Sequence, residues 1–156
     1  MLIGKSIFET LLVASLAVFF FLEAFPHFQG WGEVTPYSIS GWVVNTHAPW
    51  QRVEVQLFVD DEFIGRTVAS QSRTDVVAAG WSKDEWHGFT IPVSPVKAGN
   101  HEARVYALHD SGGGARKTLQ LVGHPIPFTV AEDGTLELLK SSSQESAAAI
   151  REKNID

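Results

Sequence analysis

The chain has 156 residues and no cysteine, with 12 Lys and Arg residues against 18 Asp and Glu residues, so its formal net charge at pH 7 is −6. This length suits one compact domain with additions, and the missing cysteines exclude disulfides, thiolate metal ligands and cysteine nucleophiles. An acidic chain lacks the cationic surface that binds phosphate backbones, so we expect no nucleic acid partner.

Residues 1–30 predict a helix that anchors the chain in a membrane. Between residues 7 and 25 only Glu9 and Glu23 are charged. Nineteen helical residues span about 28 Å, near the thickness of a bilayer's hydrocarbon core. Lys5 precedes the apolar run, which favours a cytoplasmic N-terminus and an exported remainder in a bacterial inner membrane. The residues expected to face lipid are Leu11, Leu12, Val18, Phe19, Phe20, Phe21 and Leu22.

A cleavable signal peptide is the alternative for this segment, because its uninterrupted apolar core is short. Leu22-Glu23-Ala24 is a poor match to the small-residue pattern of a cleavage site, which favours a retained anchor. Glu9 lies at the cytoplasmic interface or faces a partner helix, since a carboxylate inside the membrane is costly and is usually paired.

After residue 37 the hydrophobic period changes to two, which indicates strands with one buried face. Residues 53–59 alternate clearly, an acidic turn at residues 60–62 follows, and residues 63–69 complete a hairpin. Further strands are expected at residues 39–44, 89–93, 103–108, 119–122 and 126–130. About seven short strands separated by turns predict an all-β antiparallel sandwich behind a single transmembrane helix.

Several segments resemble a bacterial immunoglobulin-like module of the accessory type found on envelope and cell-surface proteins. They are Ile39-Ser40-Gly41-Trp42-Val43, the acidic turn, and residues 73–76, 87–89, 99–101 and 103–107. The resemblance implies an immunoglobulin-like fold but little about activity. It divides the chain into an anchor or uncleaved signal at residues 1–30, a linker at 31–37, the sandwich at 38–131, and a final hairpin strand with a polar tail at 132–156.

Some residues of these segments have structural explanations. We expect Gly88 to permit close packing before Phe89 enters the core, and Gly99 to supply a turn conformation. Arg73 and Asp75 are expected to form a buried pair that fixes the crossing between the sheets. Trp42 is expected in the core or between the sheets. The polar tail contains a short segment, residues 146–153, with helix propensity.

The sequence offers no catalytic pattern. The six histidines form no metal-binding spacing, the Gly112–Gly114 run lacks a phosphate-binding context, and residues 60–62 fall short of a calcium loop. We therefore predict that the chain is not an enzyme and needs no metal or cofactor.

Recognition is the remaining class of function, and it centres on Trp50, Trp81 and Trp86, which are expected in loops. Exposed tryptophans are enriched at binding hot spots. They would contact a partner protein, a glycan or the membrane surface, or else fold back and cap the sandwich. Together with Glu9 they favour an accessory subunit of a larger membrane complex, of respiratory or photosynthetic type. The alternative is a module that binds envelope glycan or peptidoglycan.

Overall fold

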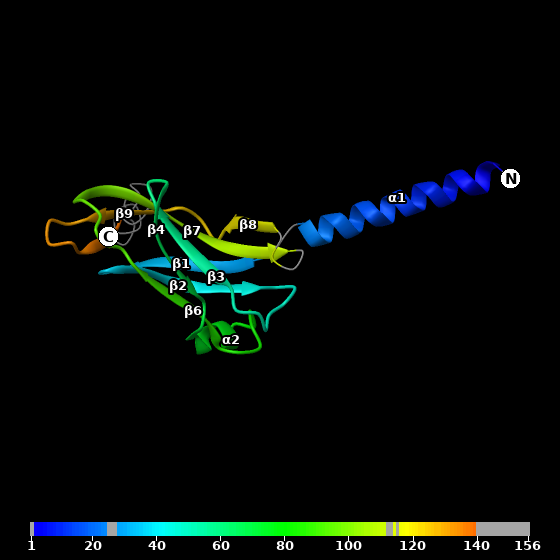
Figure 1. Ribbon diagram of the computed structural model, residues 1–156. Coiled ribbons are helices and arrows are strands. Elements are labelled where there is room, and N and C mark those ends of the chain that lie inside the picture. The colour runs from blue at the N-terminus through cyan, green and yellow to red at the C-terminus, as the bar shows by residue number, and fades with distance from the viewer. Residues whose placement is uncertain (1, 25–27, 112–113, 115, 140–156) are drawn as a thin grey trace, which may run out of the picture.

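The computed structural model describes residues 2–24, 28–111, 114 and 116–139, and within α1 it describes the side chains of residues 7–18. The chain starts with helix α1 (Leu2–Ala24) and continues with ten strands and one short helix. Figure 1 shows α1 standing apart from two stacked sheets. The sequence-based prediction of an antiparallel β-sandwich is confirmed.

One sheet, called sheet A, has four strands in the order β1 (Phe28–Thr35), β2 (Ser38–Asn45), β6 (Trp86–Pro92) and β5 (Gln71–Ser72). The second helix of the chain, α2 (Thr74–Ala78), follows β5. The sequence had indicated no helix in this region, and five residues are too few to produce a helical repeat.

The other sheet, called sheet B, has the strand order β10-β9-β7-β3-β4, and β8 pairs with β7 outside this path. Its strands are β3 (Glu54–Val59), β4 (Glu62–Val68), β7 (Gly99–Ser111), β8 (Arg116–Leu121), β9 (Ile126–Val130) and β10 (Leu136–Leu138). The predicted hairpin of β3 and β4 is present, with Asp60 and Asp61 at positive φ. A two-residue loop of this kind matches the twist of the flanking strands.

The core is a single apolar cluster between the two sheets. Alternate residues of β3, namely Val55, Leu57 and Val59, are buried, as the period of two predicts. Phe89 from sheet A and Phe128 from sheet B are among the largest buried side chains. The core therefore belongs to the sandwich alone.

The predicted linker at residues 31–37 is wrong, because Phe28–Thr35 form strand β1 and pair along their whole length with β2. Glycine hides the period of two here: Gly30 and Gly32 occupy inward positions. A Cβ at Gly30 would lie 2.4 Å from Cγ1 of Val122, and one at Gly32 would lie 3.0 Å from Cδ1 of Ile126. Side chains from sheet B thus fill the space that apolar residues of β1 would otherwise occupy.

Helix α1 forms over most of the predicted anchor, and its described side chains are exposed. Among the described residues, no helix combines the length and the apolar character needed to cross a membrane. The side chains of Phe19, Phe20, Phe21 and Leu22 and the polar tail at residues 140–156 lie outside the described part of the chain. The membrane anchor and the tail helix stay predictions.

Candidate functional site

Tryptophans gather on the outer face of sheet A. Trp31 of β1 and Trp42 of β2 are direct cross-strand partners, which places their side chains on the same face. The ring of Trp81 lies 6.1 Å from that of Trp42, tilted by 32°. Trp31 is 54% exposed and Trp81 is 50% exposed. We call Trp31, Trp42 and Trp81 the aromatic face.

Trp50 and Trp86 lie outside this cluster but are also exposed. Trp50 is 73% exposed in the loop between β2 and β3. Trp86 is the first residue of β6, not a loop residue as predicted, and it is 47% exposed. Trp50, Trp81 and Trp86 therefore do not bury themselves as caps on the sandwich, which was the structural alternative to a binding role.

A row of polar side chains crosses sheet A beside the aromatic face. The hydroxyl of Ser40 donates to that of Thr90 over 3.1 Å, and Thr90 donates to Oε1 of Gln71 over 3.0 Å. These side chains come from β2, β6 and β5. The outer face of sheet A thus combines flat apolar rings with hydrogen-bonding groups, a composition suited to binding rather than catalysis.

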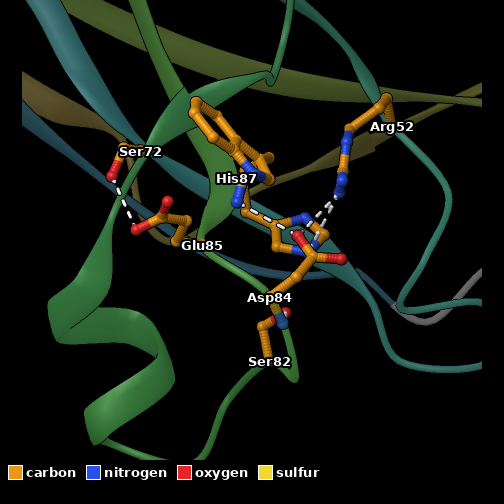
Figure 2. A network of polar contacts seen from close by, with 7 residues as sticks. Arg52, Ser72, Ser82, Asp84, Glu85 and His87 are labelled. Atoms are coloured by element: carbon orange, nitrogen blue, oxygen red, sulfur yellow. Dashed lines mark hydrogen bonds and ion pairs between the residues drawn. The ribbon is translucent and has the colours of Figure 1, made fainter.

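A partly buried polar network holds the segment that carries Trp81 and Trp86. Figure 2 shows the Asp84 carboxylate and the Arg52 guanidinium meeting at the ring of His87. Nη1 of Arg52 donates to Oδ1 of Asp84 over 3.0 Å and lies 3.4 Å from Nε2 of His87. The same carboxylate oxygen accepts the Trp86 backbone N–H over 3.0 Å. Asp84 therefore joins the loop that precedes β6 to the loop that precedes β3, which carries Arg52.

The network also sets the protonation of its members. His87 is fully buried, and this burial lowers its pKa below the usual range, although the Asp84 charge partly opposes the shift. Partial burial by itself raises the pKa of Asp84, but hydrogen bonds from the Trp86 N–H and Arg52 outweigh it, and the net pKa is lowered. The network thus favours a neutral His87 beside an ionised Asp84.

Further hydrogen bonds from side chains and backbone support the loop at residues 81–86. Figure 2 shows Ser72 facing Glu85, whose carboxylate accepts the Ser72 hydroxyl over 3.0 Å. The Trp81 N–H donates to the Val76 carbonyl over 3.1 Å. Ser82 is buried and accepts the Asp84 N–H over 3.3 Å. The exposed indoles of Trp81 and Trp86 therefore belong to a segment whose backbone is held by several hydrogen bonds.

The predicted Arg73–Asp75 pair is present and bidentate, with contacts of 2.8 and 2.7 Å. The prediction that the pair is buried is wrong, since the Asp75 side chain is 64% exposed. Hydrogen bonding to Arg73 lowers the pKa of Asp75 to about 2. Arg73 directly follows the crossing from sheet B into sheet A and lies over Gly88, where a Cβ would come within 2.8 Å of the Arg73 Cγ. The prediction that Gly88 permits close packing is confirmed.

The other structural predictions have mixed outcomes. Phe89 is 1% exposed in the core, and Gly99 has a φ of 138°, so both predictions are confirmed. Trp42 is not in the core or between the sheets. It points outward because Ile39, Gly41 and Val43 take the inward positions of β2.

Glu9 lies on the exposed surface of α1, in a shallow groove along the helix that it lines with Thr10, Val13, Ala14 and Ala17. This position is remote in sequence from the aromatic face, and the structure brings Glu9 close to none of the three tryptophans. Within the described residues, no group of three or more His, Asp or Glu side chains is arranged to hold a metal ion.

Sequence reasoning missed Trp31 as a site residue, because it was placed at the boundary of the anchor. It also missed the Arg52–Asp84–His87 network. The exposed alternation of Gln29, Trp31 and Glu33 was a usable signal for a strand. No local signal joined Arg52 to Asp84, which are 32 residues apart.

No protein-family model matches the chain, no curated protein matches it, and no solved structure matches it. The immunoglobulin-like resemblance therefore stays a prediction, and any function has to be argued from the residues themselves.

Proposed function

We propose that this chain is a non-catalytic docking subunit of a larger membrane complex, anchored by α1 and carrying an immunoglobulin-like sandwich outside the cytoplasmic membrane of a bacterium. The observation that carries the proposal is the surface of α1. Its exposed large apolar residues cover about two thirds of the helix circumference, and the small residues Ala14 and Ala17 occupy much of the remainder. The large residues are Ile7, Phe8, Leu11, Leu12, Val13, Leu16 and Val18. A helix that is apolar all round is buried in lipid or in other protein.

The lipid environment is favoured by the length and sequence of the helix. Twenty-three residues in α1 rise by about 34 Å, enough to traverse a hydrocarbon core. The sequence continues the apolar run through residues 19–22, whose side chains lie outside the described set. Lys5 before the run supports a cytoplasmic N-terminus.

The docking role is supported by the aromatic face. Tryptophan is enriched at the centres of interfaces, and rigid indoles order at a low entropic cost. The Asp84 network fixes the backbone that carries Trp81 and Trp86. A fixed aromatic surface on a sandwich with its own closed core suits contact with a neighbouring subunit.

Alkaline extraction of membranes tests the anchor. The full chain is expected to stay in the membrane pellet. Leu12→Arg combined with Leu16→Arg is expected to release it, because each arginine at a helix centre costs about 2.5–3.5 kcal/mol on insertion scales. Leu12→Phe is the matched apolar control. Recovery of the unaltered full chain in the supernatant would contradict membrane insertion.

Native electrophoresis after mild detergent extraction tests the docking role. The chain of 17.1 kDa is expected to migrate within a larger assembly, and Trp81→Ala is expected to release it. Phe63→Ala is the matched control, because Phe63 is 53% exposed on sheet B and Trp81 is 50% exposed. A free monomer from the unaltered chain would count against a subunit role.

A glycan is the second candidate for the same face, and the row formed by Ser40, Thr90 and Gln71 favours it. Sugar rings have an apolar face that stacks on indoles and hydroxyls that need hydrogen-bond partners. Sedimentation with peptidoglycan tests this candidate. Binding that Trp81→Ala abolishes and Phe63→Ala leaves intact would replace the subunit proposal with an envelope-binding module.

A further inference from the structure

The outer edge of strand β1 differs from the other sheet edges. Edge strands expose unpaired backbone groups, and proteins blunt them with short strands or charged residues. Here β5 has two residues and β10 has three, while β4 carries Glu62 and Arg66. Strand β1 ends sheet A with eight residues, and two of its inward positions are glycine. Strand β8 is a further edge and carries Arg116 and Lys117. Among the described edge strands β1 is the longest, and Glu33 is its one charged residue.

The direction of the backbone groups on β1 follows from its first residue. The Gln120 side-chain amide accepts the Phe28 N–H over 3.5 Å and donates to the Phe28 carbonyl over 3.4 Å. Phe28 therefore turns its backbone groups away from β2. Because this direction repeats every second residue, Gly32 and Val34 also turn their N–H and C=O groups outward.

Neighbouring segments close the two ends of this edge. Gly123 lies against Gly30, since a Cβ on Gly123 would be 3.6 Å from the Gly30 carbonyl oxygen. At the far end the Leu136 N–H donates to the Pro36 carbonyl over 2.8 Å. Among the residues that the structure describes, none pairs with the edge at residues 32–34.

This open part borders an apolar groove of about 420 Å³ between the edges of the two sheets. Pro125 and Pro127 form part of the opposite wall, and proline has no N–H to offer Gly32 or Val34. The other lining residues are Trp31, Glu33, His124, Ile126 and Leu138. The groove thus places unpaired strand backbone beside apolar side chains.

Leu138 is an inward-facing apolar residue of the groove that is left without a covering strand in the described part of the chain. It is the cross-strand partner of Phe128, so both side chains point toward the interior of the sandwich. Phe128 is fully buried, whereas Leu138 is 58% exposed. On the same face of β10, Leu136 is buried at 4% exposure, so among the described residues the cover of this face stops short of Leu138. One more strand beside β1 would cover Leu138 and pair with Gly32 and Val34.

We propose that this groove binds an extended peptide segment of a partner protein, which adds a fifth strand to sheet A beside β1. Its inward side chains are apolar and cover Leu138. Its outward side chains include Lys or Arg, because Glu33 is exposed on this edge and no lining residue is Lys or Arg. Glu33 makes no ion pair within the described residues; its charge acts on Arg73 only at longer range, and Arg73 is already paired with Asp75. Backbone pairing supplies affinity in such strand additions, and the alternating side chains supply specificity.

Amide hydrogen exchange and ¹⁵N chemical shifts of the full chain in detergent test the proposal with an acetylated peptide of four Lys-Val repeats. The peptide is expected to slow exchange at Gly32 and Val34. A peptide of four Glu-Val repeats is expected to bind about tenfold more weakly, because like charges at a rim disfavour association. Glu33→Lys is expected to reverse this preference. Leu138→Arg is expected to abolish binding, and the exposed position of Leu138 makes the variant compatible with folding.

Several results would overturn the proposal. The first is equal binding of both peptides to unaltered and Glu33→Lys protein. The second is no change at Gly32 and Val34 at millimolar Lys-Val peptide. The groove would instead be assigned to a second copy if the chain forms a dimer, exchange at these amides is slow in that dimer, and Leu138→Arg dissociates it. Slow exchange that is lost on removal of residues 140–156 would assign it to the chain's own tail. Trp81→Ala is expected to leave peptide binding unchanged, which separates this site from the Trp81 end of the aromatic face; Trp31 borders both surfaces.

Discussion

The two outer faces of the sandwich cover one core, but they differ in how far their surface side chains are exposed or paired with one another. On sheet B the polar and aromatic side chains satisfy one another: Arg66 pairs with Glu54, and Phe58 packs edge-on against Tyr106 with 5.4 Å between ring centroids. On sheet A, Trp31 and Trp81 remain half exposed. Sheet B also exposes a ring, since Phe63 is 53% exposed, but no strand of sheet B carries a tryptophan. We therefore propose sheet A as the recognition face, because tryptophan is strongly enriched at interface hot spots.

The largest expected effects test whether the two faces share one core. Phe89→Ala removes a buried ring beneath sheet A and Phe128→Ala removes one beneath sheet B. Each is expected to lower the free energy of unfolding by about 3–5 kcal/mol, because each leaves a cavity. Urea denaturation of the full chain in detergent measures both. A loss confined to one variant would mean that the two sheets do not unfold as a unit.

Removal of the Asp84 carboxylate is expected to loosen the aromatic loop without unfolding the sandwich. Asp84→Ala deletes the hydrogen bonds to Arg52 and to the Trp86 N–H. Water can reach both donors, so the expected cost is about 0.5–1.5 kcal/mol for each hydrogen bond. Hydrogen exchange at the Trp86 amide should accelerate, while exchange on β3 of sheet B stays slow. Unchanged exchange at Trp86 would mean that the loop does not depend on this network.

The two sheets are also expected to respond to pH in opposite directions, through one inward-facing histidine each. Burial lowers the pKa of His87 from 6.5, so the neutral ring is favoured when folded. Its contribution to stability is present above pH 6.5 and is lost as the pH falls. The hydrogen bond to Asp60 raises the pKa of His101 from 6.5. Its contribution is present below pH 6.5 and is lost as the pH rises through the folded-state value.

Thermal unfolding of His87→Gln and His101→Gln between pH 5 and 8 separates these contributions. Relative to the unaltered chain, the His87 variant should lose less stability on acidification. The His101 variant should show its deficit at the acidic end and approach the unaltered chain at the basic end. Parallel pH profiles for all three proteins would contradict the assigned pKa shifts.

The sequence predicted the architecture of the sandwich where alternate residues meet a single core. Val55, Leu57 and Val59 alternate and are buried, and the acidic turn after them forms as expected. It failed for β1 because two inward positions are glycine, and the side chains that fill the space, Val122 and Ile126, come from far along the chain. The hydrophobic pattern of one segment does not show which side chains a distant segment packs against it.

The candidate site was predicted in part for the same reason. Trp50, Trp81 and Trp86 were expected in loops, where they would either bind a partner or fold back on the sandwich, and all three are exposed. The partnership of Trp31 with Trp42 depends on the register between β1 and β2, which requires β1 to be recognised as a strand. Burial of His87 against Arg52 and Asp84 depends on packing across the sandwich and has no signature within either segment.

The smallest expected effects concern the exposed ion pairs on each face. Arg66 is 69% exposed and lies 3.7 Å from Glu54 on sheet B, so Arg66→Gln is expected to change the free energy of unfolding by about 0.2–1 kcal/mol at most. Arg73→Gln on sheet A should cost more, because its stem also packs over Gly88. Urea denaturation at low and high salt distinguishes the two, since salt screens charge but not packing. An Arg73 deficit that disappears at high salt would show that its stem contributes nothing.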